Sequence, residues 1–329
     1  MKNMDAQYYI DGVEAGNRLV LARTITLIES SLPAHKQLAR EIVDSLLDRT
    51  GKAVRLGITG VPGAGKSTFI EVFGTMLTEA GLKVAVLAID PSSSRSGGSI
   101  LGDKTRMERL AVNERAFIRP SPSGGTLGGV AGKTRETMLV CEAAGFDVII
   151  IETVGVGQSE TTVASMVDFF LVLMIAGGGD ELQGIKKGVL EVADAIVINK
   201  ADGDNVDRAE LARREYEAAL NLLMPYSPNW TVPVMTCSAL ANHGIEAIWQ
   251  KIEEHRRQMQ DSGEFEGKRK KQALQWFRFI LDEGLRSWFY TSERVQQEMP
   301  QLLGEIEAGT ASPTAAASRL LDLLDHRPL

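Results

Sequence analysis

The chain has 329 residues, enough for one large α/β domain with extensions or for two small domains. Hydrophobic residues make up 44% and charged residues 24%, and the net charge of −7 excludes a general nucleic-acid binder, which needs a basic face. The longest apolar run, residues 169–176, is too short to span a bilayer, so we expect no membrane partner. The chain starts without a signal-type apolar segment, and its two cysteines lack metal-type spacing. We therefore expect a cytoplasmic protein.

Apolar residues at helical spacing predict that residues 1–49 form a helical N-terminal extension. From residue 54 onwards, short apolar runs alternate with helical stretches. The runs are residues 54–59, 84–89, 148–151, 169–175, 195–198 and 232–236. They are apolar on both faces, which is typical of buried parallel strands. The fold class predicted is therefore α/β, a doubly wound, mostly parallel sheet of the P-loop NTPase type over residues 50–260.

The remaining segments are less regular. Residues 91–145 are too long for a simple crossover and rich in Ser and Gly, so we interpret them as an elaborated insertion. A helix is predicted from residue 243 to about residue 259, followed by a polar, charged linker over residues 261–271. An apolar helix over residues 273–290 and two amphipathic helices up to residue 324 then complete a helical C-terminal arm, residues 261–329.

The sequence GVPGAGKS, residues 60–67, matches the phosphate-binding pattern G-x-x-x-x-G-K-[ST] between a predicted strand and a predicted helix. Its glycines let backbone N–H groups surround a phosphate, and the helix dipole adds to this attraction. Lys66 supplies charge to the β- and γ-phosphates, and the Ser67 hydroxyl is a ligand for Mg²⁺. The residues expected to contact the nucleotide here are Gly60, Pro62, Gly63, Ala64, Gly65, Lys66, Ser67 and Thr68.

A second motif predicts which base is bound. Asn199, Lys200 and Asp202 form the N-K-x-D element after a predicted strand. A carboxylate accepts two hydrogen bonds from guanine N1–H and the exocyclic amine, whereas adenine would leave it unpaired. The tripeptide after the next strand resembles the companion element whose backbone contacts guanine, namely Ser238, Ala239 and Leu240. Together these elements favour GTP and GDP over adenine nucleotides.

Carboxylates at strand ends predict the magnesium site. Asp90 and Glu152 each end a predicted strand, and Mg²⁺ prefers a few carboxylates together with phosphate oxygens and water. Asp103 is a further candidate in the insertion. Glu152 also opens a stretch that stands where many GTPases have D-x-x-G, so we expect the N–H of Gly155 to sense the γ-phosphate.

Turnover is predicted to be slow. Many GTPases orient the attacking water with a glutamine directly after the D-x-x-G glycine, but here that residue is Val156. The catalytic candidates are therefore Lys66 together with Lys104, Arg106 or a group from a partner protein. The activity expected is hydrolysis of GTP to GDP and phosphate.

Two long runs, residues 90–107 and 152–160, resemble the MeaB/ArgK GTPases, the SIMIBI-class chaperones associated with methylmalonyl-CoA mutase. The resemblance covers nearly the whole chain. It implies a homodimeric G protein that gates cofactor loading and protects an adenosylcobalamin-dependent methylmalonyl-CoA mutase, or a related cobalamin-dependent mutase. It also implies that residues 177–188 are a third switch that contacts the mutase.

Two questions stay open at this stage. The apolar helix over residues 273–290 carries six aromatic residues and packs either on the protein's own core or against a second copy of the chain. The second copy is favoured by the linker before the helix.

The function has two alternatives, a metallochaperone-type GTPase and a kinase of an amino-acid transport protein. Metallochaperone relatives usually carry His-rich or paired-Cys tracts, whereas this chain has four dispersed histidines. A kinase needs a phosphoacceptor, and no catalytic base of the H-R-D type is visible.

Overall fold

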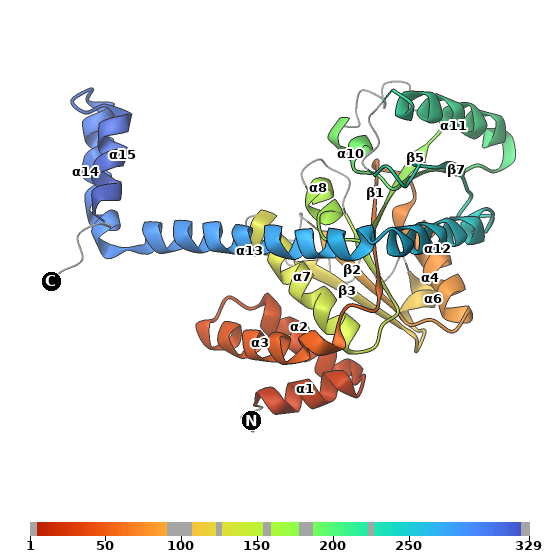
Figure 1. Ribbon diagram of the computed structural model, residues 1–329, viewed down its shortest axis with the longest axis horizontal. Coiled ribbons are helices and arrows are strands. Elements are labelled where there is room, and N and C mark those ends of the chain that lie inside the picture. Colours follow the sequence, from red (N-terminus) through yellow and green to blue (C-terminus); the bar gives the residue numbers. More distant parts are fainter. Residues whose placement is uncertain are drawn as a thin grey trace. The chain divides into compact units, whose positions relative to one another are not determined.

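The structure is a computed structural model that describes residues 5–90, 107–122, 127–153, 159–177, 187–222 and 227–323. Within these residues, seven strands form one parallel sheet in the order β3-β2-β4-β1-β5-β6-β7 (Figure 1). The strands are β1 (Val54–Gly60), β2 (Val84–Asp90), β3 (Ala116–Pro122), β4 (Val148–Glu152), β5 (Phe169–Ile175), β6 (Ala195–Asn199) and β7 (Val234–Thr236). The predicted α/β class with a doubly wound parallel sheet is confirmed.

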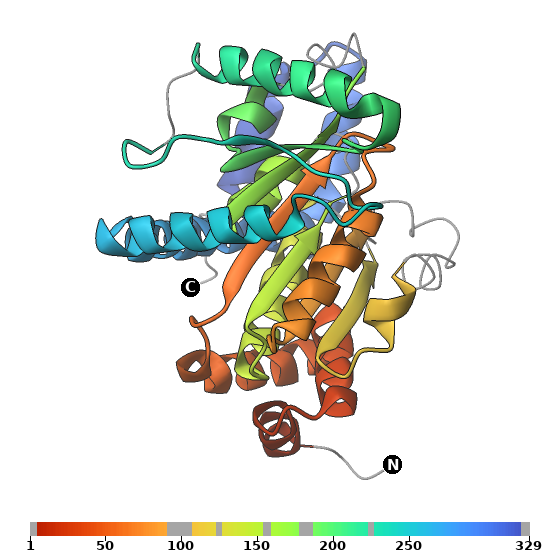
Figure 2. The same ribbon diagram turned by 90° about the vertical axis from the view of Figure 1, so that its right-hand side faces the viewer.

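The six predicted apolar runs are all strands, because residues that are apolar on both faces suit a sheet that is covered on both sides. Every residue of β4 and β6 is buried. Helices α4 (Lys66–Glu79) and α12 (Ile245–Asp261) cover one face of the sheet, where Leu56 and Ile58 of β1 share a core cluster with Phe69 and Phe73 of α4 (Figure 2).

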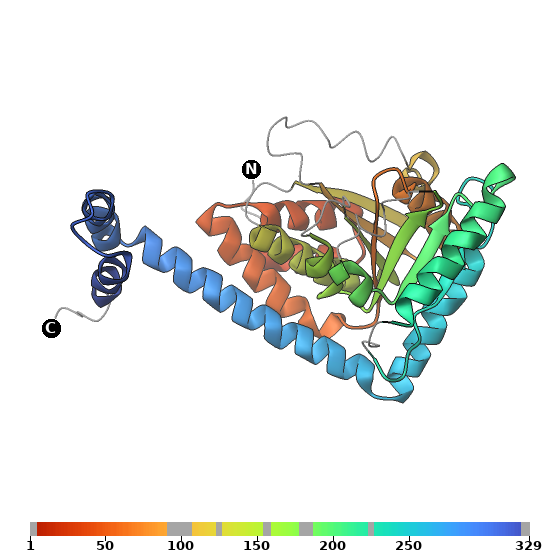
Figure 3. The ribbon, with the colours of Figure 1, turned by 90° about the horizontal axis from the view of Figure 1, so that it is seen from above.

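The other face carries helices α7 (Leu127–Ala143) and α8 (Ser159–Ala164), and α8 packs against β1 at Gly57. Three N-terminal helices lie on the outer side of α7 (Figure 3). They are α1 (Ala6–Glu14), α2 (Arg18–Glu29) and α3 (Pro33–Leu46). Shorter connections contain α6 (Glu108–Ala111), α10 (Lys187–Glu191) and α11 (Val206–Leu220), with 3₁₀ turns at Leu47–Arg49 and Gly203–Asn205.

The interpretation of residues 91–145 as an elaborated insertion is only partly right. Residues 91–106 and 123–126 lie outside the described residues, but the rest contains α6, the strand β3 and the whole of the long helix α7. β3 was not predicted, because Arg119 and Pro120 interrupt its apolar pattern. Proline is tolerated here since β3 is an edge strand: among the residues that the structure describes, β2 alone pairs with it.

The predicted polar linker over residues 261–271 is wrong. Helix α12 continues to Asp261, and after a short turn α13 (Glu264–Thr291) begins within the supposed linker. Two charged residues there have partners directly before strands β5 and β6: Lys268 Nζ lies 3.4 Å from Asp194 Oδ2, and Arg269 Nη2 lies 2.7 Å from Asp168 Oδ2. Their polarity reflects ion pairing, not a solvated linker.

The chain divides into two compact units at Gln272, within α13. The second unit, residues 273–329, contains the rest of α13 and the two predicted amphipathic helices, α14 (Glu293–Glu307) and α15 (Pro313–Asp322). Val295 and Leu302 of α14 are buried, and Arg319 of α15 pairs with Glu305 at 2.7 Å. Among the described helices, none combines the length and the apolar character that crossing a bilayer requires.

Candidate functional site

The carboxyl ends of the parallel strands bring the predicted site residues to one edge of the sheet. Gly60 ends β1, Asp90 ends β2, Glu152 ends β4 and Asn199 ends β6. These strands lie near the centre of the sheet, where β1 reaches the P-loop. Open parallel sheets bind ligands outside the carboxyl ends of their strands, so this edge is the candidate site.

The phosphate loop takes a backbone course that only glycine permits at two points. Gly60 has φ +155°, and a Cβ there would lie 2.2 Å from the carbonyl oxygen of Leu173. Gly65 has φ +82° and precedes the first turn of α4, where a Cβ would lie 2.9 Å from Nδ2 of Asn199. The close approach of three strands at the loop therefore depends on these glycines.

Lys66 begins α4 and turns back onto the phosphate loop. Its Nζ donates to the carbonyl oxygens of Gly60 at 2.8 Å and Val61 at 3.3 Å. Burial lowers the pKa of the Lys66 ammonium, while the negative charges of Glu152 and Glu160 act in the opposite direction. The ammonium therefore lies in a partly buried position with carboxylates nearby, where phosphate oxygens would replace the carbonyl acceptors.

Ser67 and Glu152 come together across the gap between α4 and β4. The Ser67 hydroxyl donates to Oε1 of Glu152 at 3.2 Å, and the Glu152 side chain is buried. Beside them the hydroxyls of Thr153 and Thr59 lie 2.7 Å apart. Hydroxyl and carboxylate oxygens are the hard donors that Mg²⁺ prefers, so this pair fits a magnesium site at the phosphates.

Asn199 links the three loops of the site. Its Nδ2 donates to the carbonyl oxygen of Ala64 at 2.8 Å, and its Oδ1 accepts from the N–H of Ala239 at 3.1 Å and from the thiol of Cys237 at 3.4 Å. The side chain is almost fully buried. One amide therefore holds the P-loop and the tripeptide after β7 at fixed positions beside the N-K-x-D element.

Asp202 is oriented by the loop after β7. The Ser238 hydroxyl donates to Oδ2 of Asp202 and accepts from the N–H of Ala241 at 3.0 Å. Lys200 has φ +63°, an uncommon conformation for a residue with a side chain. Leu240 is mostly exposed, so its side chain takes no part in the buried contacts.

Several predicted residues cannot be placed. Asp103, Lys104 and Arg106 lie outside the described residues, as do Gly155 and most of the third switch at residues 177–188. Asp90 ends β2 at the right edge of the sheet, but its side chain is not described. The magnesium and γ-phosphate assignments of these residues stay predictions.

Some contacts at the site were not predicted from the sequence. Cys237 and Thr59 carry no motif of their own, and their contacts with Asn199 and Thr153 depend on which strands are neighbours. Ser238 was expected to act through its backbone, whereas its hydroxyl also binds Asp202. The one available signal was position, since each of these residues stands at or near the carboxyl end of a strand.

Comparisons with known proteins identify the family. A protein-family profile described as "Methylmalonyl Co-A mutase-associated GTPase MeaB" matches residues 21–294. A putative GTPase of Caulobacter vibrioides is 56% identical over 316 residues, which cover 95% of this chain and 97% of that protein. GTPase ArgK of Escherichia coli is 50% identical over 309 residues, covering 94% and 93%.

Two further relatives extend the comparison. The mitochondrial methylmalonic aciduria type A homolog of Mus musculus is 45% identical over 326 residues, covering 96% of this chain and 79% of that protein. A crystal structure described as LAO/AO transport system kinase is 41% identical, covers 99% of each chain and has a TM-score of 0.80. On these grounds, and with the P-loop and N-K-x-D elements at one edge of the sheet, the chain belongs to the MeaB family of methylmalonyl-CoA mutase-associated GTPases.

Proposed function

We propose that this protein is a GTP-hydrolysing switch that associates with an adenosylcobalamin-dependent methylmalonyl-CoA mutase and gates the loading and protection of its cofactor. The family description names the mutase, and relatives carry the names GTPase and methylmalonic aciduria type A homolog. The observation that carries the proposal is the position of Asn199, which ties the N-K-x-D element to the phosphate loop at Ala64. This contact supports the proposal that Asp202, three residues after Asn199, binds guanine beside a phosphate-binding loop.

Guanine is selected by Asp202 in this proposal. Its carboxylate accepts from N1–H and the exocyclic amine, while the Ser238 hydroxyl holds Oδ2 in place. Lys200 covers the base and ribose. Lys66 leaves the carbonyls of Gly60 and Val61 and binds the β- and γ-phosphates, and the negative phosphates favour its protonated form.

We assign the magnesium site to Ser67 and Glu152, with Asp90 and Asp103 as further candidates. Bound Mg²⁺ would neutralise charge on the β- and γ-phosphate oxygens. Ser67 contributes its hydroxyl oxygen, and Glu152 either ligates directly or holds a water, since its side chain is one carbon longer than the usual aspartate. Gly155 supplies an N–H to the γ-phosphate.

Hydrolysis is expected to be slow because Val156 stands where a water-orienting glutamine is usual. Lys104, Arg106 or a partner's residue completes the site. A purified chain that hydrolysed GTP at about 10 s⁻¹ or faster, well above intrinsic Ras-like rates, would contradict this part of the proposal.

A second copy of the chain is the proposed partner of α13. Its residues in the second unit expose a series of large apolar side chains to solvent, which favours an interface over a core position. The exposed residues are Leu274, Phe277, Ile280, Leu281, Leu285, Trp288 and Tyr290. Light scattering on a chain that ends at Gln272 tests the idea, because that cut keeps the ion pairs of Lys268 and Arg269. An unchanged dimer would refute it.

The mutase assignment is tested by co-purification. The protein is mixed with methylmalonyl-CoA mutase in GDP and in a non-hydrolysable GTP analogue, and the bound fraction is measured in each. We expect binding that depends on the nucleotide. Binding that is absent, or equal in both nucleotides, would count against the switch.

A second candidate is a kinase acting on a transport protein, favoured by the description of one solved relative as LAO/AO transport system kinase. GTP labelled at the γ-phosphate separates the two functions. Release of labelled phosphate alone supports the switch, and labelled protein supports the kinase.

A further inference from the structure

The turn between α8 and β5, residues 165–168, is held from outside by three side chains. Arg135 of α7 donates through Nη2 to the carbonyl oxygen of Ser165 at 2.9 Å. Gln272 Nε2 donates to the carbonyl oxygen of Val167 at 2.8 Å, and Lys268 Nζ donates to that of Asp168 at 2.7 Å. Two of these three donors come from α13, so the turn and the start of α13 are bound together.

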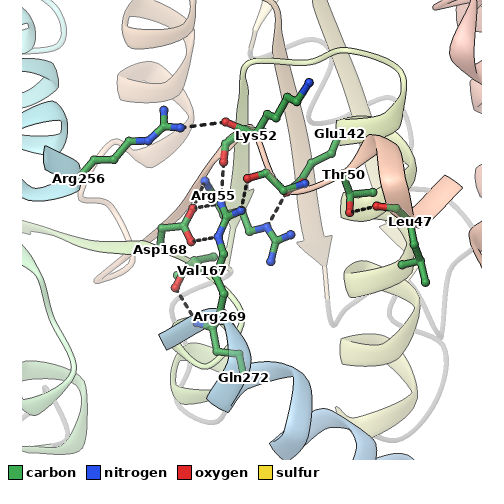
Figure 4. A network of polar contacts seen from close by, with 12 residues as sticks. Leu47, Thr50, Lys52, Arg55, Glu142, Val167, Asp168, Arg256, Arg269 and Gln272 are labelled. Carbon is green, nitrogen blue, oxygen red and sulfur yellow. Dashed lines mark hydrogen bonds and ion pairs between the residues drawn. The ribbon is translucent and has the colours of Figure 1, made fainter. Parts of the chain in front are cut away.

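The strongest contact in this group is the ion pair between Asp168 and Arg269 (Figure 4). Arg269 Nε lies 2.8 Å from Oδ1 and Nη2 lies 2.7 Å from Oδ2, which is a bidentate arrangement. The backbone N–H of Arg55 also donates to Oδ2 at 2.8 Å. The two side chains are 6% and 14% exposed, so their charges are little screened by solvent.

The start of α13, residues 264–272, is fixed to the sheet by further contacts of the same residues. Arg269 Nη2 donates to the carbonyl oxygen of Ala53 at 2.7 Å, just before β1. Arg135 holds both partners at once, because its Nη1 donates to the carbonyl oxygen of Gln272 at 2.8 Å while its Nη2 holds Ser165. We call residues 165–168 together with residues 264–272 the clamp.

The clamp is connected to the candidate nucleotide site by α8 and β1. A Cβ on Gly57 of β1 would lie 3.0 Å from Val163 and 3.1 Å from Val167. Helix α8 and the turn therefore pack directly against the strand that leads to the P-loop. Along the chain, α8 follows β4, whose last residue is Glu152. Because α8 ends at Ala164 and runs directly into residues 165–168, a displacement of α8 would displace these residues as well.

We propose that the clamp transmits the nucleotide state of the P-loop to α13. The inference rests on the proposed nucleotide switch, but it does not depend on which protein the switch serves. When α8 shifts with the γ-phosphate, residues 165–168 shift with it. A buried bidentate ion pair stretches only at a large electrostatic cost, so residues 264–272 follow. Packed side chains and networks of hydrogen bonds and ion pairs can carry coupling of this kind, and the clamp is such a network.

Hydrogen exchange of the α13 amides tests the proposal in the full chain. Exchange is measured in GDP and in a non-hydrolysable GTP analogue for the unaltered protein, Arg269→Lys, Gln272→Ala and Lys271→Ala. Arg269→Lys keeps the charge but loses the bidentate geometry, and Gln272→Ala removes the bond to Val167. Lys271 is exposed on the same turn of α13 and serves as the matched control.

We expect a nucleotide-dependent difference in exchange for the unaltered protein and for Lys271→Ala. That difference should be about fivefold or more in exchange rate, the lower end of typical allosteric couplings, and it should be lost in Arg269→Lys and Gln272→Ala. Because coupling is reciprocal, the ratio of affinities for the two nucleotides changes in the same variants. Thermal unfolding shows whether each clamp variant folds. If one of the two does not fold, the exchange measured in the other tests the proposal.

A nucleotide-dependent difference that is the same in both clamp variants as in the unaltered protein would overturn the proposal. The proposal would also be overturned if the α13 amides exchanged equally in both nucleotides although the unaltered protein binds both. Nucleotide affinity is measured separately on the unaltered protein, so failure to bind guanine nucleotide is recognised as failure of the proposed function instead.

Discussion

The Nδ2 atom of Asn199 donates a hydrogen bond of 2.8 Å to the carbonyl oxygen of Ala64, so a residue at the end of β6 fixes the conformation of the loop that follows β1. The same side chain accepts from the N–H of Ala239. Replacing it leaves buried polar groups on two loops without their partner. Leaving a buried polar group unsatisfied costs about 1–3 kcal/mol.

Asn199→Ala is therefore expected to lower the free energy of unfolding by about 1–3 kcal/mol and to weaken GTP binding. Chemical unfolding and titration with GTP measure the two effects. Asn221→Ala, an exposed asparagine at the end of α11, is the matched control and should change neither. Equal stability of the two variants would contradict the bracing role.

The base preference is predicted to change in Asp202→Asn. The new amide presents a donor where guanine also presents one, and the GTP affinity should fall by about 1–3 kcal/mol, or roughly 5- to 160-fold. Xanthine triphosphate, which has an acceptor carbonyl in place of the amine, should bind the variant better than GTP does. Asp204→Asn is the control, since Asp204 is an exposed carboxylate of the adjacent 3₁₀ turn. An unchanged GTP affinity in Asp202→Asn would exclude the assignment.

Two glycines of the phosphate loop should tolerate alanine very differently. Gly60→Ala places a Cβ 2.2 Å from the carbonyl oxygen of Leu173, so β1 and β5 must separate. Gly63 has φ +80° but no atom within 4 Å of a Cβ, so Gly63→Ala suffers only conformational strain of about 1–2 kcal/mol. Thermal unfolding should show the larger loss for Gly60→Ala. A larger loss of stability in Gly63→Ala would contradict the close approach of Gly60 to Leu173.

Stability is predicted to fall in mild acid because of His255. Burial lowers the pKa of this histidine below its ordinary value of 6.5; Asp194 raises it, at 3.8 Å, and Lys268 lowers it. The unfolded chain then binds the proton more tightly than the folded protein does. Stability that is fully present above pH 6.5 is therefore lost as the pH falls from 6.5 towards the lower folded pKa.

His255→Leu removes the titrating group from its position between Phe169 and Trp230, and should reduce the loss of stability between pH 7.5 and 5.5. Urea unfolding at the two pH values measures the change in the free energy of unfolding. The control is His243→Ala, which removes an exposed histidine and should keep the pH dependence of the unaltered protein. An identical pH dependence in His255→Leu would show that other groups are responsible.

Much of the fold could be predicted from the sequence because six strands are apolar on both faces and follow one another with helices between. β3 escaped prediction, since an edge strand has less to bury and its Pro120 reads as a turn residue. The charged stretch before α13 was misjudged for a related reason. Lys268 and Arg269 have partners in Asp168 and Asp194, which are distant in sequence, and local composition cannot reveal such pairs.

In the candidate site too, contiguous motifs could be recognised from the sequence, whereas contacts between distant segments could not. The P-loop and the N-K-x-D element are contiguous motifs, each directly after a strand, so their residues could be named in advance. The bond from Ser238 to Asp202 depends on β6 and β7 being neighbours in the sheet, which no motif states. Contacts within one segment were therefore accessible from the sequence, and contacts between segments required the topology.

The edge strand β3 has a consequence for solubility. Pro120 and Pro122 stand two residues apart and so point their nitrogens to the same side. The ladder with β2 runs through Pro120 and ends at Pro122, and the carbonyl oxygen of Arg115, at an odd-numbered position, is the one that accepts from Val84 at its start. The nitrogens that carry no hydrogen therefore lie along the outer margin of the sheet. A second sheet approaching that margin would find missing donors at successive positions. This protects the protein from edge-to-edge aggregation and from amyloid-like growth at a margin that would otherwise be a template.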